Sequence, residues 1–307
     1  MARKLISFDW AIKKILRSKA NFGILEGFLS ELLFTDIKIL EVLESESNPE
    51  FDKNKTNRVD IKVKDSQQQI IIVEIQYSRE LDYLQRILFA SAKAINEHLY
   101  EGDAYAEVSK IICINILYFN FGKGDDYIYH GTTKFIGLHN QHELQLSEEQ
   151  KNLYQVNTIT DIYPEYYLIE LRNFNDIAKD SLDEWVYFLK NETIKNNFQA
   201  QGLAEAKQTL DVLKMTEAER WQYEQHQKQR HHEASLYQST YVLGEMKGLE
   251  QGLKKGMEQG IVKGVKKGKH QQKIDIALAL LDVLDTETIA LKTNLSVEQV
   301  QALHKDK

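Results

Sequence analysis

Several residue types that define common protein classes are scarce in this sequence of 307 residues. The single cysteine, Cys113, excludes a disulfide scaffold and a cysteine-rich zinc module, and it fits a reducing compartment. Only two prolines occur, which argues against a proline-rich disordered chain. The best apolar run, Ile111 to Phe119, is too short to span a bilayer. Asp9 and Lys13 interrupt the apolar stretch near the start, so we expect no signal peptide, no membrane partner and a cytoplasmic protein.

Positive charge is also in short supply. The chain has 39 Lys and Arg against 46 Asp and Glu, a net charge of −7, which excludes a protein that coats nucleic acid by bulk positive charge. Residues 1–20 and 244–273 are nevertheless basic. Two such segments on an acidic chain can contact a polyanion locally, although solvated helix faces are the simpler explanation of a charge run taken alone.

The apolar patterning predicts an α/β domain over residues 1–190. Helices are expected where apolar residues recur at helical spacing, over 5–16, 21–33, 80–100 and 181–190, with Asn21 as the cap of the second helix. Strands are expected where β-branched or alternating apolar residues occur, over 59–64, 70–76, 110–119, 127–135 and 166–173. The first two strands form a hairpin. This order of elements predicts a mixed sheet flanked by helices.

The remaining chain predicts an extended helical tail. Residues 191–243 are polar and indicate a helical connector, and 244–273 hold seven glycines spaced by four, from Gly244 to Gly268. Each glycine costs a helix about 1 kcal/mol relative to alanine. Two interpretations stay open: a helix whose glycine face lets another copy of the chain approach closely and self-associate, or a flexible basic tether.

The C-terminal segment, 274–307, predicts a helical hairpin or a helix-turn-helix. Asn294 separates two short helices, and Ser296 with Gln299 has the spacing of a capping box. A DNA-reading second helix needs basic or amide side chains, and 296–304 offers Gln299, Gln301 and His304 but no Arg or Lys. A small protein-contact unit is therefore favoured over a DNA-reading one.

The hairpin carries the most informative chemistry. If its strands pair symmetrically about their turn, Asp60 lies opposite Glu74, with Cβ atoms about 4.5–5.5 Å apart. Two such carboxylates repel unless a cation lies between them, and oxygen ligands suit Mg²⁺ or Mn²⁺. Lys62 shares the face of Asp60 and offers positive charge to a phosphate. The alternative is an ordinary hairpin with its polar face in water, although Ile70 and Ile72 precede Glu74 on that face.

The order of several motifs resembles a known family. The residues that carry the resemblance are Asp9 and Lys13 on the opening helix, Asp60 and Glu74-Ile75-Gln76 on the hairpin, and Tyr83 and Arg86 on the next helix. This series, followed by Glu/Lys/Gly repeats, resembles the PD-(D/E)XK nuclease superfamily. More narrowly, it is similar to the Rpn-like recombination-promoting nucleases, a group also described as transposases. The resemblance covers about residues 5–175, and the tail more loosely.

The resemblance implies a metal site on the hairpin. Asp60 and Glu74 would be metal-binding carboxylates, with the carbonyl of Ile75 as a third ligand and Asp9 as an accessory acidic residue. Gln76 stands where the superfamily at large has its catalytic lysine, a departure that the subgroup shares.

Other cations are then candidates for the missing lysine. Lys62 and Lys13 are expected on the side of the hairpin where it would lie. Arg86 is expected to clamp a phosphate, with a helical ion pair to Asp82 as the alternative. Tyr83 is expected to pack in the core rather than to stack on a base.

These residues predict a DNA endonuclease that depends on Mg²⁺ or Mn²⁺ and acts in recombination or transposition with little sequence specificity. The alternative is a catalytically weak or inactive nuclease fold that binds DNA or assembles through its tail. A third interpretation is an acidic helical scaffold without a nucleic-acid partner. The histidines at 226, 231 and 232 cluster without a cysteine or a carboxylate pair, which disfavours a zinc site.

Overall fold

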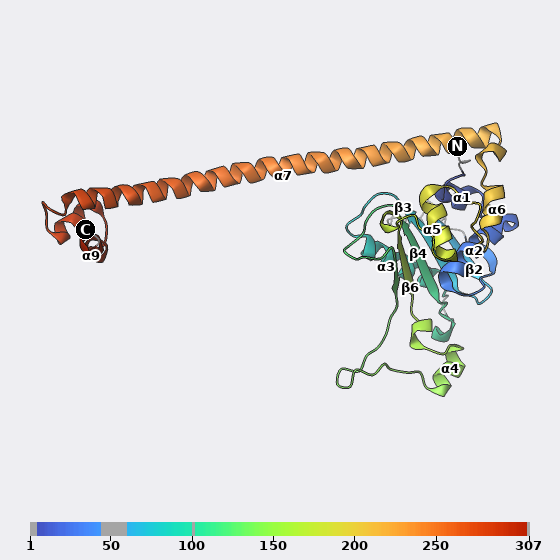
Figure 1. The fold of residues 1–307 in the computed structure, drawn as a ribbon. Coiled ribbons are helices and arrows are strands. Elements are labelled where there is room, and N and C mark those ends of the chain that lie inside the picture. The colour runs from blue at the N-terminus through green and yellow to red at the C-terminus, as the bar shows by residue number, and fades with distance from the viewer. Residues whose placement is uncertain (1–4, 44–59, 100–101, 306–307) are drawn as a thin grey trace. The chain divides into compact units, whose positions relative to one another are not determined.

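The computed structural model describes residues 5–43, 60–99 and 102–305, whose fold is drawn in Figure 1. Expected features that include residues 1–4, Val59, Tyr100 or 306–307 lie in part outside the described residues. The chain divides into two compact units, Met1–Ala234 and Ser235–Lys307. We call them the first and the second unit.

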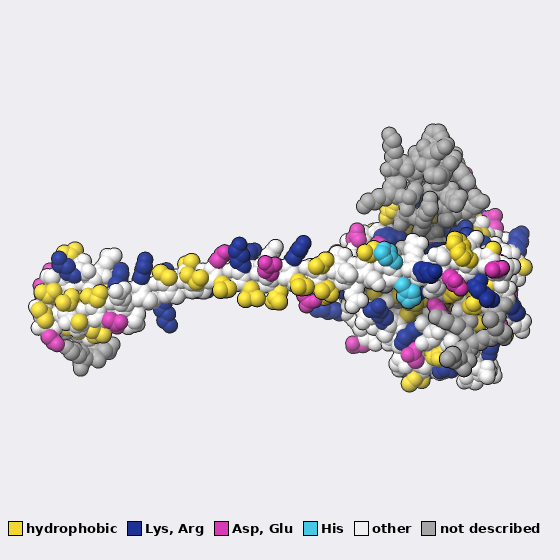
Figure 2. All heavy atoms as spheres, turned by 90° about the horizontal axis from the view of Figure 1, so that it is seen from above, with side chains coloured by type: hydrophobic (Ala, Val, Ile, Leu, Met, Phe, Trp, Pro, Cys, Tyr) yellow, Lys and Arg dark blue, Asp and Glu magenta, His cyan; other side chains and the backbone are white. Residues whose placement is uncertain are grey.

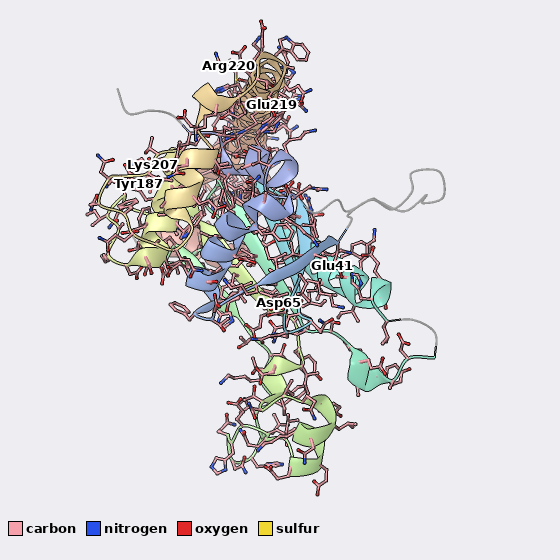
Figure 3. All side chains as sticks on the ribbon, turned by 90° about the vertical axis from the view of Figure 1, so that its right-hand side faces the viewer. Glu41, Asp65, Tyr187, Lys207, Glu219 and Arg220 are labelled. Carbon is pink, nitrogen blue, oxygen red and sulfur yellow. The ribbon has the colours of Figure 1, made fainter. Side chains whose placement is uncertain are left out.

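The first unit is built on a sheet. Its six described strands are β1 (Ile39–Leu43), β2 (Ile61–Asp65), β3 (Ile70–Gln76), β4 (Ile111–Leu117), β5 (Ile128–Gly131) and β6 (Glu165–Glu170). They lie in the order β1-β2-β3-β4-β6-β5. The strands β3, β4 and β6 are parallel and the outer pairs are antiparallel, so the predicted mixed sheet is confirmed. The edge strand β1, whose Glu41 is labelled beside Asp65 of β2 in Figure 3, was not predicted.

Helices cover both faces of the sheet. Helices α1 (Phe8–Lys14), α2 (Phe22–Leu33), α5 (Ser181–Asn191) and α6 (Leu203–Thr209) contribute to the main core on one face, together with Ile71, Val73 and Ile75 of β3. The alternate residues Ile70 and Ile72 pack against α3 (Tyr83–Glu97) on the other face. Because both faces are covered, β3 and β4 are apolar along nearly their whole length.

Short segments complete the described elements of the first unit. They are α4 (Glu148–Tyr154) and the 3₁₀ turns η1 (Lys19–Asn21), η2 (Tyr105–Glu107), η3 (Ile159–Asp161), η4 (Leu171–Asn173) and η5 (Val212–Lys214).

The first two helices differ in detail from the expectation. Helix α1 starts at Phe8 rather than at residue 5, because Leu5 and Ile6 donate backbone hydrogen bonds to Glu192 and Leu210, at 3.1 and 2.8 Å. The predicted cap by Asn21 is wrong. Its side-chain amide donates to the carbonyl of Ile15 at 3.0 Å instead of accepting from the start of α2.

Residues 191–216 differ from the expected helical connector. Helix α6 and the turns around it pack onto the sheet, and the buried members of this segment are Ala200, Leu203, Ala206 and Leu210. The segment directly before α6 approaches α2 closely at Gly27, where a Cβ atom would lie 2.3 Å from the carbonyl oxygen of Gln201. The few small and apolar residues of this otherwise polar segment are therefore part of the hydrophobic core, because they pack against α2.

Helix α7 (Glu217–Leu280) begins in the first unit and continues into the second, where it contains the glycine repeat. A continuous helix favours the helical interpretation of the repeat over the tether. Apart from the neighbouring residues and the adjacent backbone of the helix itself, no described atom lies within 4 Å of a Cβ placed on any of the seven glycines. Exposed apolar side chains follow the repeat, seen as yellow spheres along the helix in Figure 2: Leu249, Leu253, Met257, Ile261 and Val265.

The second unit has its own small core. The end of α7 packs with α8 (Thr286–Thr293) and α9 (Val297–Lys305) around Ala277, Ile289 and Val300. The predicted capping box is confirmed, because Ser296 and Gln299 exchange side-chain-to-backbone hydrogen bonds at 2.9 and 3.2 Å. None of the described helices combines the length and the apolar character needed to cross a bilayer.

Candidate functional site

A pocket of about 310 Å³ lies where strand β3 ends. The residues that line it come from α1, the start of β2, the end of β3, α3 and the first turns of α7: Asp9, Lys13, Asp60, Glu74, Ile75, Gln76, Tyr77, Ser78, Arg86, His226, Gln229 and Arg230. The structure therefore brings together every site residue predicted from the sequence except Lys62.

The two carboxylates of the hairpin meet in this pocket as the pairing predicts. The observed register joins Ile61 with Val73, which places Asp60 beside Glu74. One oxygen of Asp60 accepts the backbone N–H of Ile75 at 2.7 Å. Because Glu74 is only 3 % exposed and β2 is covered as well, the interpretation of this hairpin as having a polar face in water is wrong.

Each carboxylate has a cationic partner. Lys13 Nζ lies 3.0 Å from Asp60 Oδ1, and Arg86 of α3 donates to Glu74. Arg86 also donates to both oxygens of Glu80, at 2.8 and 3.0 Å. This arrangement puts alternating negative and positive charges along one wall of the pocket.

The charge of Glu74 is held in an unfavourable environment. Burial raises the pKa of Glu74 to about 7, and the charges of Asp60 and Glu80 act in the same direction. Arg86 opposes them by favouring the ionised form. A carboxylate in this condition gains from an additional cation nearby.

The amide of Gln76 is already engaged. Its nitrogen donates to the carbonyl of Ser78 at 3.1 Å and to Glu80 at 2.8 Å. An uncharged amide with both hydrogen bonds committed beside the strand supplies no positive charge to the pocket.

Lys62 lies outside the residues that line the pocket. Its side chain is buried beneath α3, and its Nζ lies 2.7 Å from Glu97 near the end of that helix. Lys62 pairs with Ile72, which lies two residues before Glu74 on β3. Lys62 is therefore further from the end of β3, where the pocket lies. The prediction that Tyr83 packs in the core is confirmed, because the residue is fully buried and its hydroxyl bonds to Asn115 at 3.0 Å.

Asp9 is contacted by side chains of α7, a part of the chain that the sequence analysis did not connect with the site. Its carboxylate lies 2.6 Å from His226 Nε2 and 3.6 Å from Arg230 Nη1. Burial by itself would raise the pKa of Asp9, but the His226 hydrogen bond and the Arg230 charge hold it well below its usual value. Residues 223, 226, 227 and 230 have the spacing of one helix face. This spacing is the sequence signal that could have grouped them as a single contact surface.

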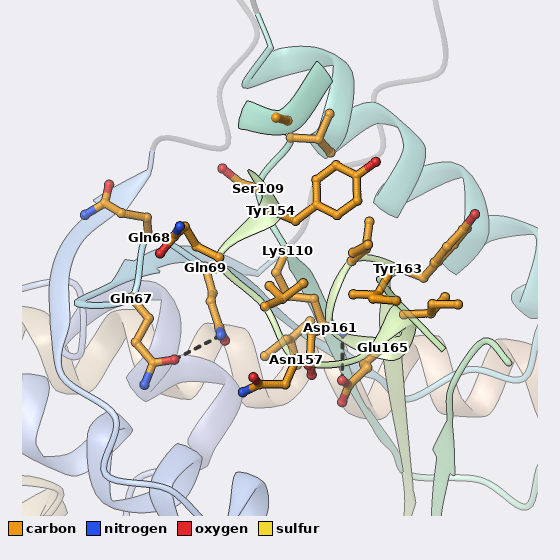
Figure 4. Close-up of a pocket in the computed structure, with 18 of the residues that line it drawn as sticks. Gln67, Gln68, Gln69, Ser109, Lys110, Tyr154, Asn157, Asp161, Tyr163 and Glu165 are labelled. Carbon is orange, nitrogen blue, oxygen red and sulfur yellow. Dashed lines mark hydrogen bonds and ion pairs between the residues drawn. The ribbon is translucent and has the colours of Figure 1, made fainter. Parts of the chain in front are cut away.

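A larger cavity of about 990 Å³ lies at the opposite end of the parallel strands (Figure 4). Its labelled polar side chains are mostly amides and tyrosines, and two of its pairs are already joined. Gln69 donates to Gln67 at 3.1 Å, and Lys110 lies 2.7 Å from Glu165. The smaller pocket, with two facing carboxylates, is the one suited to phosphodiester chemistry.

Comparison with known families agrees with this geometry. A family model described as PD-(D/E)XK nuclease family transposase matches residues 6–240. The chain belongs to this family. Searches among curated proteins and solved structures find no match. Membership in the PD-(D/E)XK nuclease family transposases indicates a nuclease- or transposase-related function, for which the family implies DNA as the substrate. The matched region includes Asp9, both carboxylates of the hairpin and Arg230.

PD-(D/E)XK nucleases generally use divalent metal ions. Within the described residues, no three or more His, Cys, Asp or Glu side chains are arranged to hold a metal. Two carboxylates, Asp60 and Glu74, do share the pocket, and the raised pKa of Glu74 reports their mutual repulsion as well as burial. This oxygen donor pair fits Mg²⁺, which usually binds through one or two carboxylates and keeps several waters.

Proposed function

We propose that this PD-(D/E)XK family transposase is a DNA endonuclease that depends on Mg²⁺ or Mn²⁺ and acts in recombination or transposition. The observation that supports this proposal is the pairing of Asp60 with Glu74 in one pocket that also contains Lys13 and Arg86. Charged side chains of this kind suit the phosphate backbone rather than base edges, so we expect little sequence specificity.

Each charged residue has a role in the proposed reaction. Asp60, Glu74 and the carbonyl of Ile75 would hold the divalent ion, which would supply Lewis acidity to activate water and to offset phosphate charge. Lys13, beside Asp60, stabilises the negative charge that develops on the phosphate and so takes the place of the lysine missing at Gln76. Arg86 orients Glu74 and offers its guanidinium to the phosphate.

A plasmid-nicking assay with Mg²⁺ or Mn²⁺ tests this proposal. Asp60→Asn and Glu74→Gln should each lower the nicking rate by at least about 100-fold, because each removes half of the carboxylate pair. Glu41→Gln is the matched control, since Glu41 is an exposed carboxylate on strand β1 of the same sheet (Figure 3). Equal rates for the Asp60 variant and the wild type would reject the assigned site.

One observation favours a second candidate function. Lys13 and Arg86 already neutralise the two carboxylates, and Gln76 provides no cation. The alternative is therefore a protein of this fold that binds DNA without cutting it and associates through α7, whose glycine repeat carries exposed apolar side chains. DNA binding without nicking in either metal, together with a dimeric or larger mass by light scattering, would support this alternative.

A further inference from the structure

The first turns of α7 are fastened to α1 by a set of side chains on one helix face. The backbone N–H of Ser7 donates to the Tyr223 hydroxyl at 3.1 Å, and Gln227 donates to the Ser7 hydroxyl, also at 3.1 Å. His226 reaches the buried carboxylate of Asp9 at 2.6 Å. These contacts hold Arg230, one turn further along α7, in the wall of the carboxylate pocket.

Arg230 is positioned mainly by stacking. Its guanidinium lies over the Tyr77 ring, 3.8 Å from the ring centre, and Tyr77 in turn stacks on Tyr118 with 4.2 Å between ring centres. Tyr77 directly follows the last residue of β3. The rigid end of a central strand therefore fixes the plane of the guanidinium.

The hydrogen-bonding capacity of Arg230 is little used. Its Nη1 atom lies 3.6 Å from Asp9 and 3.6 Å from Glu192, distances longer than normal hydrogen bonds. Among the described residues, its one hydrogen bond runs to Gln227 at 3.4 Å. A guanidinium has five N–H donors. Asp9 Oδ1, facing it, is likewise buried without a hydrogen-bond partner in the described part of the chain.

The other cations of the pocket are more tightly engaged than Arg230. Lys13 lies 3.0 Å from Asp60, and Arg86 donates to Glu74 and, at 2.8 Å, to Glu80. A guanidinium in a fixed plane with spare donors is suited to a phosphodiester, whose two anionic oxygens match its fork geometry.

We propose that Arg230 contacts a backbone phosphate of the DNA in this pocket, and that Asp9 and Tyr77 are its positioning residues. The proposal rests on the proposed function only in taking DNA as the ligand. It assigns to the start of α7 a direct part in substrate binding, although this segment lies more than 140 residues beyond the hairpin that carries the carboxylates.

Binding to a short DNA duplex, followed by fluorescence anisotropy without divalent metal and at several salt concentrations, tests the proposal in the full-length chain. Arg230→Gln should weaken binding about tenfold, and it should reduce the slope of log affinity against log salt by about 1. Arg220→Gln is the matched control, because Arg220 is an exposed arginine on the same helix (Figure 3), and it should change neither quantity. Equal behaviour of the two variants would overturn the proposal.

A purely structural role for Arg230 is distinguished by Arg230→Lys. This variant keeps the positive charge but loses the planar stack on Tyr77, so a phosphate contact predicts a salt slope like that of the wild type. A slope reduced as far as in Arg230→Gln would overturn the proposal. Should Arg230→Gln fail to fold, the wild type provides the test through an arginine-specific dicarbonyl reagent and mass spectrometry. DNA should protect Arg230 and leave Arg220 unprotected, and unchanged modification of Arg230 would again overturn the proposal.

The outcomes separate this proposal from the proposed function. Loss of nicking in Asp60→Asn together with an unaltered salt slope in Arg230→Gln would support the nuclease site and reject the phosphate contact of Arg230. An altered salt slope in Arg230→Gln, in a protein whose wild type does not nick DNA, would support the phosphate contact and reject the proposed catalysis. A wild type that does not bind DNA would contradict both.

Discussion

Glu74 links the stability of the fold to the chemistry of the pocket. Its pKa in the folded protein, about 7, lies above the ordinary glutamate value of 4.5. The folded state therefore binds the Glu74 proton more tightly than the unfolded state does. The resulting stabilisation is complete below pH 4.5 and is lost as the pH rises through about 7.

Glu74→Gln should remove this pH dependence. A neutral amide cannot ionise, so the variant should keep the stability that the wild type loses between about pH 5 and pH 8. Urea unfolding of both proteins across this range measures the difference, and parallel profiles would contradict the expected pKa. Mg²⁺ should stabilise the wild type more above pH 7 than below it, because an ionised carboxylate is the better ligand, and this gain should be absent from the variant.

Lys13 and Lys62 are distinguished by their partners. Lys13→Gln should reduce nicking about 100-fold, as expected for loss of a preorganised positive group at the phosphate. Lys62→Gln should leave the rate within about threefold and lower the free energy of unfolding by about 1–3 kcal/mol, because it breaks the contact between a buried ammonium and Glu97. Rates and urea midpoints of the two variants measure both effects. The opposite assignment of the two losses would restore Lys62 as the catalytic cation.

At the scale of elements, the contact between α2 and α6 depends on one glycine. A Cβ atom at Gly27 would lie 2.3 Å from backbone of the 201–202 segment, whereas at Gly23 it would meet the flexible end of the Glu205 side chain. Both positions lie inside the same helix, where alanine is intrinsically favoured over glycine by about 1 kcal/mol. The two sites therefore share the helix-propensity gain and differ only in what surrounds them.

Gly27→Ala should destabilise the first unit by about 1–3 kcal/mol, because the backbone of the neighbouring segment has to move. Gly23→Ala is the matched control and should be neutral or stabilising by up to about 1 kcal/mol. Denaturant unfolding monitored by tryptophan fluorescence measures both, since Trp185 is buried in the same core. A stabilised Gly27→Ala variant would contradict the close packing of α2 and α6.

Features that depend on residues close together in the sequence were easier to predict than contacts between distant segments. The capping box at Ser296 and Gln299 and the register of the 61–76 hairpin were predictable, because each depends on residues a few positions apart. The Asn21 cap failed because its side-chain amide donates to the carbonyl of Ile15, six residues earlier, instead of accepting from the start of α2. Helix α6 was missed because its few buried residues gain their partners from α2, far away in the chain.

At the scale of the whole molecule, the two units have separate hydrophobic cores. The main core belongs to the first unit, and the smaller one surrounds Ile289 and Val300 in the second. Each core is formed by residues of its own unit. We therefore expect the chain to unfold in two steps that respond to different substitutions.

Ile289→Ala should lower the stability of the second unit by about 2–5 kcal/mol, because the residue is fully buried in a small core. Leu291→Ala on the same helix is the control, since Leu291 is 80 % exposed, and its effect should stay within about 0.5 kcal/mol. Differential scanning calorimetry separates the two transitions. A shift of the main transition by Ile289→Ala would contradict the independence of the cores.

The sequence by itself determined strands β2 to β6 of the sheet that carries the site, and the pairing of Asp60 with Glu74. Alternation, β-branching and a short turn specify which residues of a hairpin face one another, and these signals are local. Only the tertiary structure decided which cations join the carboxylates. Lys13 lies in the pocket, whereas Lys62 lies beneath α3. His226 and Arg230 line the pocket from a helix that begins more than 140 residues after the hairpin. Such contacts arise from the packing of α1, α3 and α7 around the end of β3, and a periodic pattern shows which residues share a helix face but not what that face packs against.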